Sequence, residues 1–520
     1  MTKNFSKKSI LMVALIAMAL LFASCALASA GTPETIKSSK DRLVYVITTD
    51  PLNMDPHDST LFGHHHITRQ MYETLVARDR DMNLVPCLAE SWKYEDDLTL
   101  VFTLRKGVKF HNGEELKASD VFFTLKRASE STLPGSQNTK QIDFDKTEVR
   151  GDYEIAIVTK TPYPLQLPML ENSNISIFSE KGYKDNNGDF NKASFGTGAF
   201  KFVRYTPGDS VLLKANENYR IAGLPYVKEI LFRIINDASS RAIEAETGGA
   251  DIVYGIDAVD IPRLAANPKL SLTRQLTSNT TYVAFNTQDK VLSNPLVRKA
   301  ISHAMNRDAA LKVAYGDFGK LAKDGIFSPG LDGRHPNLEP FIPQYDSELA
   351  KKLLAEAGYP DGLTVEIVCE NDDSMRKNFC EALQAQFANA GITLKLDFTE
   401  ANVWTEKVLT GKAQLAIYGF SATTGEVGRN LLRWLRGSSD FKMNGYEGEE
   451  LQEVVNEALR TIDDEKRFAL YHKAQEIIIS ENLVMPYWFK EACAATQPKV
   501  RNFWICPTYE TVFLQEVYVE

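Results

Sequence analysis

The second half of the chain alternates helical and strand patterns, and this alternation constrains the fold more than any other feature. Pro295 stands at a favoured first helical position, and Leu296, Val297, Ala300 and Ile301 follow it at the spacing of one helix face. Helices that alternate with strands indicate α/β layers. The patterns predict helices at 295–305, 346–357 and 375–387, and strands at 363–369, 392–398 and 415–418.

The first half is richer in strand patterns. Residues 43–47 predict the first strand of the folded protein, and 92–94 with 99–104 predict a hairpin around the acidic turn 95–97. Residues 117–127 have helical spacing, with capping residues at their start. A chain of 520 residues suggests about two to four structural units, and we find no internal repeat and no linker rich in Pro or Gly. We therefore expect units that are joined by short crossovers.

The N-terminus has the pattern of an export signal. Three lysines lie within the first eight residues, and 10–22 is an uninterrupted apolar run, too short to span a bilayer comfortably. This predicts a signal peptide over residues 1–30. Two processing routes are open: residues 22–25 resemble a lipobox with Cys25 as the acylated residue, and 28–30 offer a site for ordinary signal peptidase. The protein is expected in the periplasm, or on the outer face of a membrane if Cys25 carries lipid.

Export makes disulfides possible among the five cysteines that follow Cys25. Two local pairs fit the spacing, but the sequence does not establish either; they are Cys369–Cys380 and Cys493–Cys506. No CxxC motif is present, so we expect no metal site from cysteine. The net charge of −9 argues against nucleic acid as a partner, because phosphates repel an acidic chain.

Motifs of catalysis are absent from the sequence. There is no GxSxG elbow, no HExxH and no phosphate loop, so we expect no enzyme and no cofactor. The GxG at 196–198 leads into a strand-like run instead of the helix that a dinucleotide site needs, which favours a tight turn. His64, His65 and His66 point about 100° apart on a helix and do not converge on one metal ion. Polar surface or cleft lining is the expected role of these three histidines.

A series of dispersed motifs carries a resemblance to a known family. In their order along the chain they resemble the signature of the peptide/nickel solute-binding proteins of ABC importers, family 5. The strongest are residues 86–92, 102–113 and 118–121, and others that agree are 52–56, 71–76, 196–202, 216–219, 345–359 and 464–471.

The resemblance implies a fold and a function. The implied fold is an α/β, two-lobed periplasmic binding protein (type II-like, cluster C) with an extra N-terminal subdomain. Its parts would be lobe I at 41–77, 198–285 and 488–520, the extra subdomain at 78–197, and lobe II at 286–487. The implied function is that of a monomeric solute-binding component, which captures a short peptide or peptide-like ligand by lobe closure. It would deliver this ligand to the permease and ATPase subunits of an ABC importer.

The sequence constrains the identity of the ligand less than it constrains the family. Peptide-binding relatives carry Gly-Trp-x-x-Asp in the second lobe, where the Asp pairs with the peptide's ammonium group. The matching stretch here has Phe420 and Thr423, and Thr423 cannot form an ion pair. The oligopeptide binders have Arg where this chain has Ile417. Glu426 could substitute for the missing carboxylate; alternatively the ligand lacks a free amine, as in a modified peptide, a sugar, an opine-like conjugate or a metal chelate such as a nickel complex.

Seven residues are expected to contact the ligand. They come from the first crossover, from the lobe junction and from the second lobe, and for each aromatic residue among them a core position is an open alternative. The seven are Asn53, Met54, Tyr282, Trp404, Phe420, Thr423 and Asn444.

Overall fold

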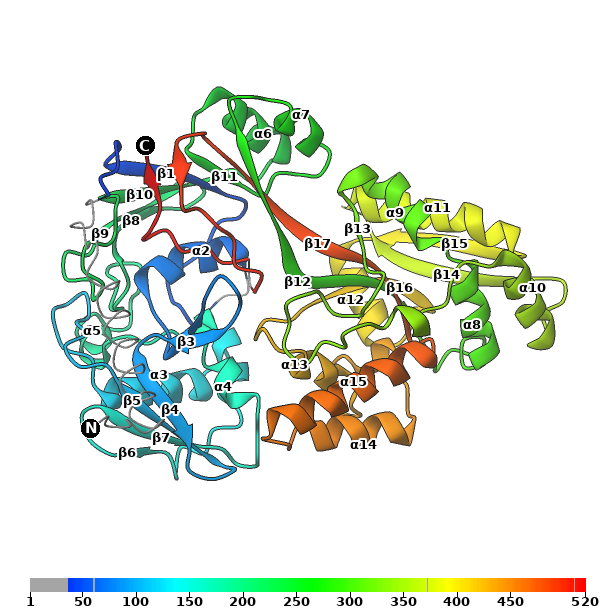
Figure 1. The fold of residues 1–520 in the computed structure, drawn as a ribbon, viewed down its shortest axis with the longest axis horizontal. Helices are drawn as coiled ribbons and strands as arrows, with labels where there is room; N and C mark the ends of the chain where they lie inside the picture. The colour runs from blue at the N-terminus through cyan, green and yellow to red at the C-terminus, as the bar shows by residue number, and fades with distance from the viewer. Residues whose placement is uncertain (1–35, 59–60, 372, 509) are drawn as a thin grey trace, which may run out of the picture. The chain divides into compact units, whose positions relative to one another are not determined.

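A computed structural model describes residues 36–58, 61–371, 373–508 and 510–520 (Figure 1). The predicted signal peptide and Cys25 lie outside the described residues. Within the described part, no helix combines the length and the apolar character needed to cross a membrane.

One large sheet runs through residues Ser39–Glu520. Its strand order is β15-β14-β16-β12-β17-β11-β1-β10-β9-β8, and β13 pairs with β17 in addition. β1 lies parallel to β10 and β11, and β14 lies parallel to β15 and β16. The strands are β1 (Arg42–Ile47), β8 (Phe200–Thr206), β9 (Ser210–Ala215), β10 (Glu229–Ile234), β11 (Ile252–Tyr254), β12 (Ser271–Phe285), β13 (Lys320–Leu321), β14 (Leu363–Glu370), β15 (Ile392–Thr399), β16 (Leu415–Ser421) and β17 (Val484–Thr496).

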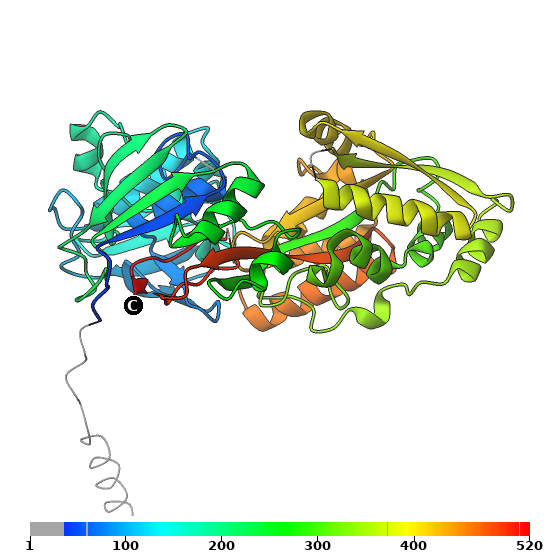
Figure 2. The same ribbon diagram turned by 90° about the horizontal axis from the view of Figure 1, so that it is seen from above.

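The two longest strands, β12 and β17, connect two lobes. They pair antiparallel along two stretches, and the register is interrupted between Leu276 and Thr280. On one side of this interruption β17 pairs with β11, and on the other side β12 pairs with β16. Figures 1 and 2 show both strands running from one lobe into the other. We call residues 39–276 with 490–520 the first lobe, and residues 280–489 the second lobe.

The first lobe holds several small cores. β1, β10 and α2 (Phe62–Met71) enclose one core, and α6 (Ala238–Thr247) with α7 (Ile261–Ala265) covers another. A separate four-stranded sheet packs against α3 (Ala118–Glu130) and has its own core. Its strands are β4 (Ala89–Tyr94), β5 (Thr99–Leu104), β7 (Glu154–Val158) and β6 (Glu148–Val149), so the predicted hairpin is confirmed. The hairpin of β2 (Val76–Arg78) and β3 (Leu84–Pro86) lies beside β4.

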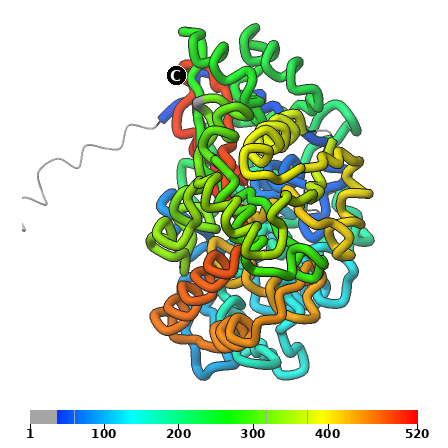
Figure 3. Tube along the Cα trace, turned by 90° about the vertical axis from the view of Figure 1, so that its right-hand side faces the viewer, coloured from blue at the N-terminus to red at the C-terminus, as the bar shows by residue number. Residues whose placement is uncertain are grey.

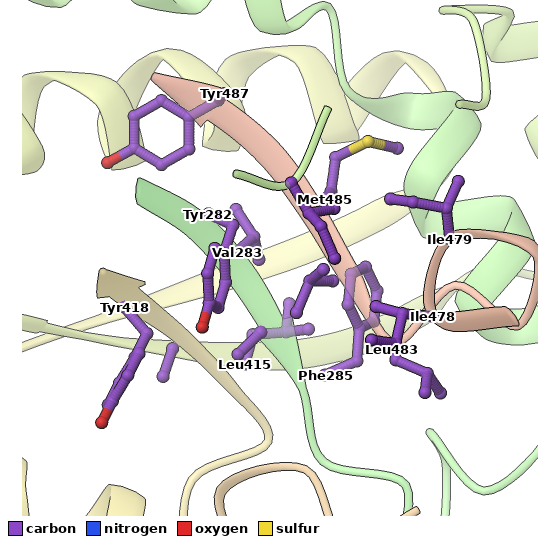
Figure 4. Close-up of a cluster of buried hydrophobic side chains, with 14 of the residues drawn as sticks. Tyr282, Val283, Phe285, Leu415, Tyr418, Ile478, Ile479, Leu483, Met485 and Tyr487 are labelled. Atoms are coloured by element: carbon purple, nitrogen blue, oxygen red, sulfur yellow. The ribbon is translucent and has the colours of Figure 1, made fainter. Parts of the chain in front are cut away.

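Helices cover the sheet of the second lobe where the sequence predicts them. Asn294 caps α8 (Pro295–Ala304), and Asp346 caps α10 (Ser347–Glu356) by accepting from the Leu349 N–H at 2.9 Å. α11 (Ser374–Asn389) packs on β14 and β15, and its Phe379 stacks on Tyr487 with ring centroids 3.7 Å apart. Figure 3 shows α14 (Glu449–Ala458) and α15 (Asp464–Ser480) side by side in this lobe. Figure 4 shows part of the core of this lobe, where aromatic and aliphatic side chains of β12, β16 and β17 lie near Ile478 and Ile479 of α15.

The lobes contact each other through buried side chains. Arg78 in the first lobe pairs with Asp332 of the second lobe at 3.2 Å and donates to the Thr424 carbonyl at 2.9 Å. Tyr163 and Leu165, from the predicted extra subdomain, belong to the core of the second lobe. The cores therefore interlock at this point, and the predicted domain boundaries stay a prediction.

The structure corrects the expectation for the three histidines and bears on the suggested disulfides. His64, His65 and His66 are fully buried on α2 instead of lining polar surface: His65 contacts Ser173, and His66 contacts Tyr45 and the Glu510 carbonyl. They point to different partners because successive helical residues face different directions. The cysteines of both suggested disulfides are free and buried in the structure.

The strand-like run predicted after the GxG at 196–198 is confirmed as β8, and the chain bends at Gly196 and Gly198. A Cβ on Gly196 would lie 2.1 Å from the Met71 carbonyl oxygen, and one on Gly198 would lie 2.4 Å from that of Gln70. Both glycines therefore permit the chain to approach the end of α2 before β8 begins.

Candidate functional site

A cavity of about 480 Å³ lies between the lobes beside β17. Both lobes and the crossing strand contribute to its walls, which is the arrangement expected of a ligand cleft. Its lining residues are Ile256, Asp257, Ala258 and Ile261 of the first lobe, Tyr315, Phe318, Glu370, Asp373, Ser374, Met375, Arg376 and Trp488 of the second lobe, and Lys490 and Glu491 on β17.

The second-lobe wall lies where β14 ends and α11 begins. Asp373 caps α11 by accepting from the backbone N–H groups of Met375 and Arg376 at 3.0 and 2.9 Å. The Arg376 guanidinium lies 2.6 Å from Glu370 and 3.1 Å from Asp373. Ligands in α/β sheets characteristically bind outside the carboxyl ends of parallel strands, and Glu370 is the last residue of such a strand.

Two aromatic rings form a second part of this wall. Tyr315, on α9 (Arg307–Tyr315), and Trp488 have ring centroids 4.3 Å apart. Burial raises the pKa of Tyr315 well above its ordinary value, so its hydroxyl stays protonated. The Tyr315 hydroxyl and the Trp488 indole N–H are buried and have no hydrogen-bond partner among the described residues. A buried donor without a partner is costly, so a water or a bound solute is the expected partner.

Lys490 connects the cavity to the first lobe. Its ammonium lies 2.9 Å from the carboxylate of Glu510, which also accepts from the Tyr254 hydroxyl. Burial alone would raise the pKa of Glu510, but Lys490 and Tyr254 outweigh it and lower the pKa, so the carboxylate stays charged. The backbone carbonyl of Lys490 accepts from Thr277, at the point where the pairing of β12 and β17 is interrupted.

Three of the seven predicted contact residues come together in one aromatic cluster. Tyr282 lies 5.3 Å from Phe420, and Trp404 stacks on Tyr418 at 5.5 Å, measured between ring centroids. Tyr418 and Phe420 are 4.7 Å apart, and the Arg433 guanidinium lies 3.9 Å from the Phe420 ring centroid. The Tyr282 hydroxyl and the Trp404 indole N–H are buried without a hydrogen-bond partner in the described part of the chain.

The other predicted residues are dispersed. Met54 lies in the core of the first lobe, and Asn53 donates to Asp58 at 2.9 Å. Thr423 is half-buried in the turn after β16. Asn444 donates to the carbonyls of Phe285 and Leu483, which gives its side chain a structural role far along β12 from Phe420. None of the seven lines the cavity, so their role in ligand binding stays a prediction.

Glu426 is not available for a ligand. Its carboxylate is buried and lies 3.1 Å from the Arg467 guanidinium, and it accepts from the Tyr471 hydroxyl at 2.8 Å. Both partners come from α15, which the sequence pattern around residue 426 could not reveal. The suggestion that Glu426 replaces the missing carboxylate is therefore wrong.

The residues that line the cavity were not predicted from the sequence. One signal was present: Glu370 and Asp373 directly follow a strand of the predicted α/β layer, which marks an edge where ligands bind. Tyr315 and Trp488 gave no such signal, because aromatic residues in helices and strands most often form core. Across the described ranges, no group of three or more His, Cys, Asp or Glu side chains is placed to hold a metal ion.

Comparisons with known proteins agree on one family. Residues 83–442 match the family described as bacterial extracellular solute-binding proteins, family 5. The glutathione-binding protein GsiB of Salmonella choleraesuis is 28% identical over 496 residues, which cover 93% of this chain and 96% of that protein. The heme-binding protein A of Haemophilus influenzae is 28% identical over 94% of this chain and 95% of its own length.

A solved structure extends the comparison to the fold. The ABC transporter-associated periplasmic binding protein DppA of Helicobacter pylori, in complex with the peptide STSA, superimposes with a TM-score of 0.75. It is 26% identical in sequence, and the match covers 93% of this chain and 99% of that chain.

Proposed function

We propose that this chain, which belongs to the bacterial extracellular solute-binding proteins of family 5, captures short peptides or peptide-like ligands for import. Members of the family bind small solutes outside the cytoplasm and work with ABC permease and ATPase components; they are transport proteins. The predicted two-lobed α/β fold and the family resemblance are both confirmed. The ligand class is the part that we propose here.

The cavity between the lobes carries this proposal. Its walls hold four carboxylates, Asp257, Glu370, Asp373 and Glu491, together with the cations Arg376 and Lys490. A zwitterion with separated ends, such as a short peptide, can place its ammonium near carboxylates and its carboxylate near Arg376. The aromatic rings of Tyr315 and Trp488 offer apolar contact between these charges.

The position of the ammonium site differs from the one that the resemblance implies. Thr423 has no charge and Glu426 is held by Arg467, so the turn after β16 offers no free carboxylate. Asp257 is the best alternative, because it lines the cavity, is half-buried and forms no ion pair with a described cation, whereas Glu370 and Asp373 are paired with Arg376. A peptide-like ligand without a free amine is the second candidate, and the missing counter-charge after β16 favours it.

The comparisons support a peptide or a compound of similar chemistry. One relative is named for glutathione and one neighbour was solved with a peptide, although another relative is named for heme. A metal chelate, a sugar or another non-peptide solute on the same scaffold is therefore the alternative that the experiment must separate.

Closure around the ligand is the proposed mechanism. The lobes are linked by β12 and β17, whose register is interrupted where Thr277 meets Lys490, and such an interruption is a suitable hinge. A solute that contacts both lobes stabilises the closed form by its differential affinity for it. The loaded protein, acting as a monomer, would then dock on the permease.

A calorimetric screen tests the ligand class. We expect di- to pentapeptides to bind, and we expect N-acetylated peptides to separate the two candidates: binding lost on acetylation indicates a free-amine ligand. Sugars and a nickel–histidine chelate form the comparison set. Binding by one of these, with no peptide bound, would overturn the proposal in favour of the alternative.

Replacing Arg376 tests the carboxylate end of the site. We expect Arg376→Gln to weaken binding of a peptide with a free C-terminus about tenfold or more, since a charge-assisted pair is lost. Binding of the C-amidated peptide should change little. Arg436→Gln, which removes an exposed cation paired with Glu449 in the same lobe, is the matched control. Equal losses for both peptides, or none, would contradict the assigned role of Arg376.

Anchoring is a separate proposal. The family places the chain outside the cytoplasm, and we propose that it resides in the periplasm, with a lipid on Cys25 as one of the two processing outcomes. If Cys25 is acylated, Cys25→Ser is expected to move the protein from the membrane fraction to the soluble fraction. Cys87→Ser, at a buried thiol, is the control. An unchanged distribution would exclude lipidation and support cleavage after Ala30.

A further inference from the structure

The first lobe contains a second cavity that the capture of a ligand between the lobes does not use. Its volume is about 280 Å³, and every residue that lines it belongs to the first lobe. Segments far apart in sequence form its walls: the end of α2, the β2–β3 hairpin, the loop at 219–221, Trp504 and residues 513–516. Arg80, Ile221 and Glu516 are exposed, so the cavity is open to solvent.

One wall of this cavity is a stack of two cationic and two aromatic side chains. Arg80 lies 5.5 Å from the Trp504 ring centroid, Trp504 stacks on Phe513 at 5.1 Å with 14° between their planes, and Arg69 lies 5.4 Å from the Phe513 ring. The four side chains thus form a ladder with a guanidinium at each end and two aromatic rings between them. Trp504 and Phe513 are only half-buried and have ring surface left to cover.

Arg69 is the cation whose guanidinium donors are not fully used by the described residues. It donates to Thr74 at 3.2 Å and to the Glu171 carbonyl at 3.4 Å, and both contacts are long. The Glu171 carboxylate pairs with Arg78 instead, at 3.3 Å. The Nε of Arg69 is buried and has no hydrogen-bond partner among the described residues, and no described carboxylate forms an ion pair with Arg69. A half-buried guanidinium that has no ion-pair partner is stabilised by binding an anion.

The three carboxylates that line the cavity, Glu73, Asp79 and Glu516, form no ion pair with Arg69. Glu73 lies 2.9 Å from Arg220, and it accepts from the Thr197 hydroxyl at 2.8 Å and from the Tyr219 hydroxyl at 3.3 Å. The Glu73 oxygens are therefore occupied by these partners. The cavity remains open to a ligand with its own negative charge.

We propose that this cavity is a second ligand site, which binds a small planar aromatic carboxylate. The carboxylate would pair with Arg69, where a guanidinium can donate two parallel hydrogen bonds, and the ring would lie against Trp504 and Phe513. The volume is slightly below the roughly 300 Å³ at which pockets for drug-sized ligands begin, so the site suits a ligand of one ring or one fused pair. Because only the first lobe lines the site, its occupation does not require the lobes to close.

Calorimetric titration of the purified protein with benzoate and indole-3-carboxylate tests the proposal, with benzamide as the neutral analogue. We expect both acids to bind with a Kd of about 1 mM or tighter, and benzamide to bind about tenfold more weakly. Arg69→Gln is expected to weaken the binding of the acids about tenfold or more. Trp504→Leu removes the ring without touching the charge, and it should weaken binding as well.

Controls separate this site from the cleft and from misfolding. Arg42→Gln, at an exposed pair with Glu229, and Trp488→Leu, in the cavity between the lobes, should leave benzoate binding unchanged. The thermal unfolding midpoint of each variant shows whether it folds. If Arg69→Gln does not fold, the affinity of Trp504→Leu for the acids tests the proposal instead. Three results would each overturn the proposal. They are no heat of binding up to about 10 mM acid, benzamide binding as tightly as benzoate, and unchanged affinity for the acids in folded Arg69→Gln and Trp504→Leu.

Discussion

Lowering the pH from about 7 to about 4.5 is expected to destabilise this protein strongly, because the fold keeps five histidines neutral. His57, His64 and His66 are buried and His111 is half-buried, and desolvation lowers the pKa of each from 6.5 to about 4. Burial also lowers the pKa of His65 well below its ordinary value. In the unfolded chain these imidazoles regain water and titrate near pH 6.5.

The sign of the effect follows from proton uptake. Between pH 6.5 and about 4 the unfolded state binds more protons than the folded state, so stability rises with pH and is lost as the pH falls. Each histidine contributes at most about 1.4 kcal/mol per pH unit across this window. Several such groups acting together would cost a free energy comparable with a typical margin of stability of about 5–15 kcal/mol.

A matched pair of variants on α2 isolates the histidine contribution. His66→Gln should flatten the dependence of the thermal midpoint on pH between 6.5 and 5, since one titrating group is removed. Ile67→Val, at the next buried position, should lower stability by about 0.5–1.5 kcal/mol at every pH without changing the slope. A midpoint that does not fall between pH 6.5 and 5 would contradict the assignment of these histidines as neutral.

Glu426→Ala is expected to be the most destabilising single substitution among the charged residues discussed. The Glu426 and Arg467 side chains are each 4% exposed, and the change leaves the guanidinium buried without its main counter-ion. Breaking a buried pair in this way costs about 3–5 kcal/mol. Arg467 keeps Asp464 at 2.7 Å, but that carboxylate is largely exposed, so we expect the lower end of this range.

The measurement is the thermal and urea unfolding midpoint at pH 7, followed by circular dichroism. Because the protein has several cores, midpoints are compared instead of one free energy of unfolding. Glu449→Ala, which breaks the exposed pair with Arg436, is the control and should cost about 0–1 kcal/mol. Glu426→Gln keeps one accepting oxygen, replaces the other with an NH2 group and removes the negative charge, so its midpoint should lie between the two. Similar midpoints for Glu426→Ala and Glu449→Ala would refute the structural role of Glu426.

The sequence alone predicted most of the local structure and the family. The helical spacing after Pro295, the cap at Asp346 and the β-rich run at 43–47 each correspond to an element of the structure. These signals are reliable because a helix turn, a cap and a strand depend on residues only a few positions apart. The dispersed motifs identified the family, because both their residues and their order along the chain can be read directly from the sequence.

Only the tertiary structure decided how individual charged and polar side chains are used. Glu426 is held by a residue 41 positions away, Arg78 contacts a residue 254 positions away, and the ladder at Arg69 depends on Phe513. No periodicity in the sequence reports such pairs, because they form only when distant segments pack together. The burial of the histidines and the residues that line both cavities depend on the same packing, since exposure is a property of the folded neighbours and not of the residue itself.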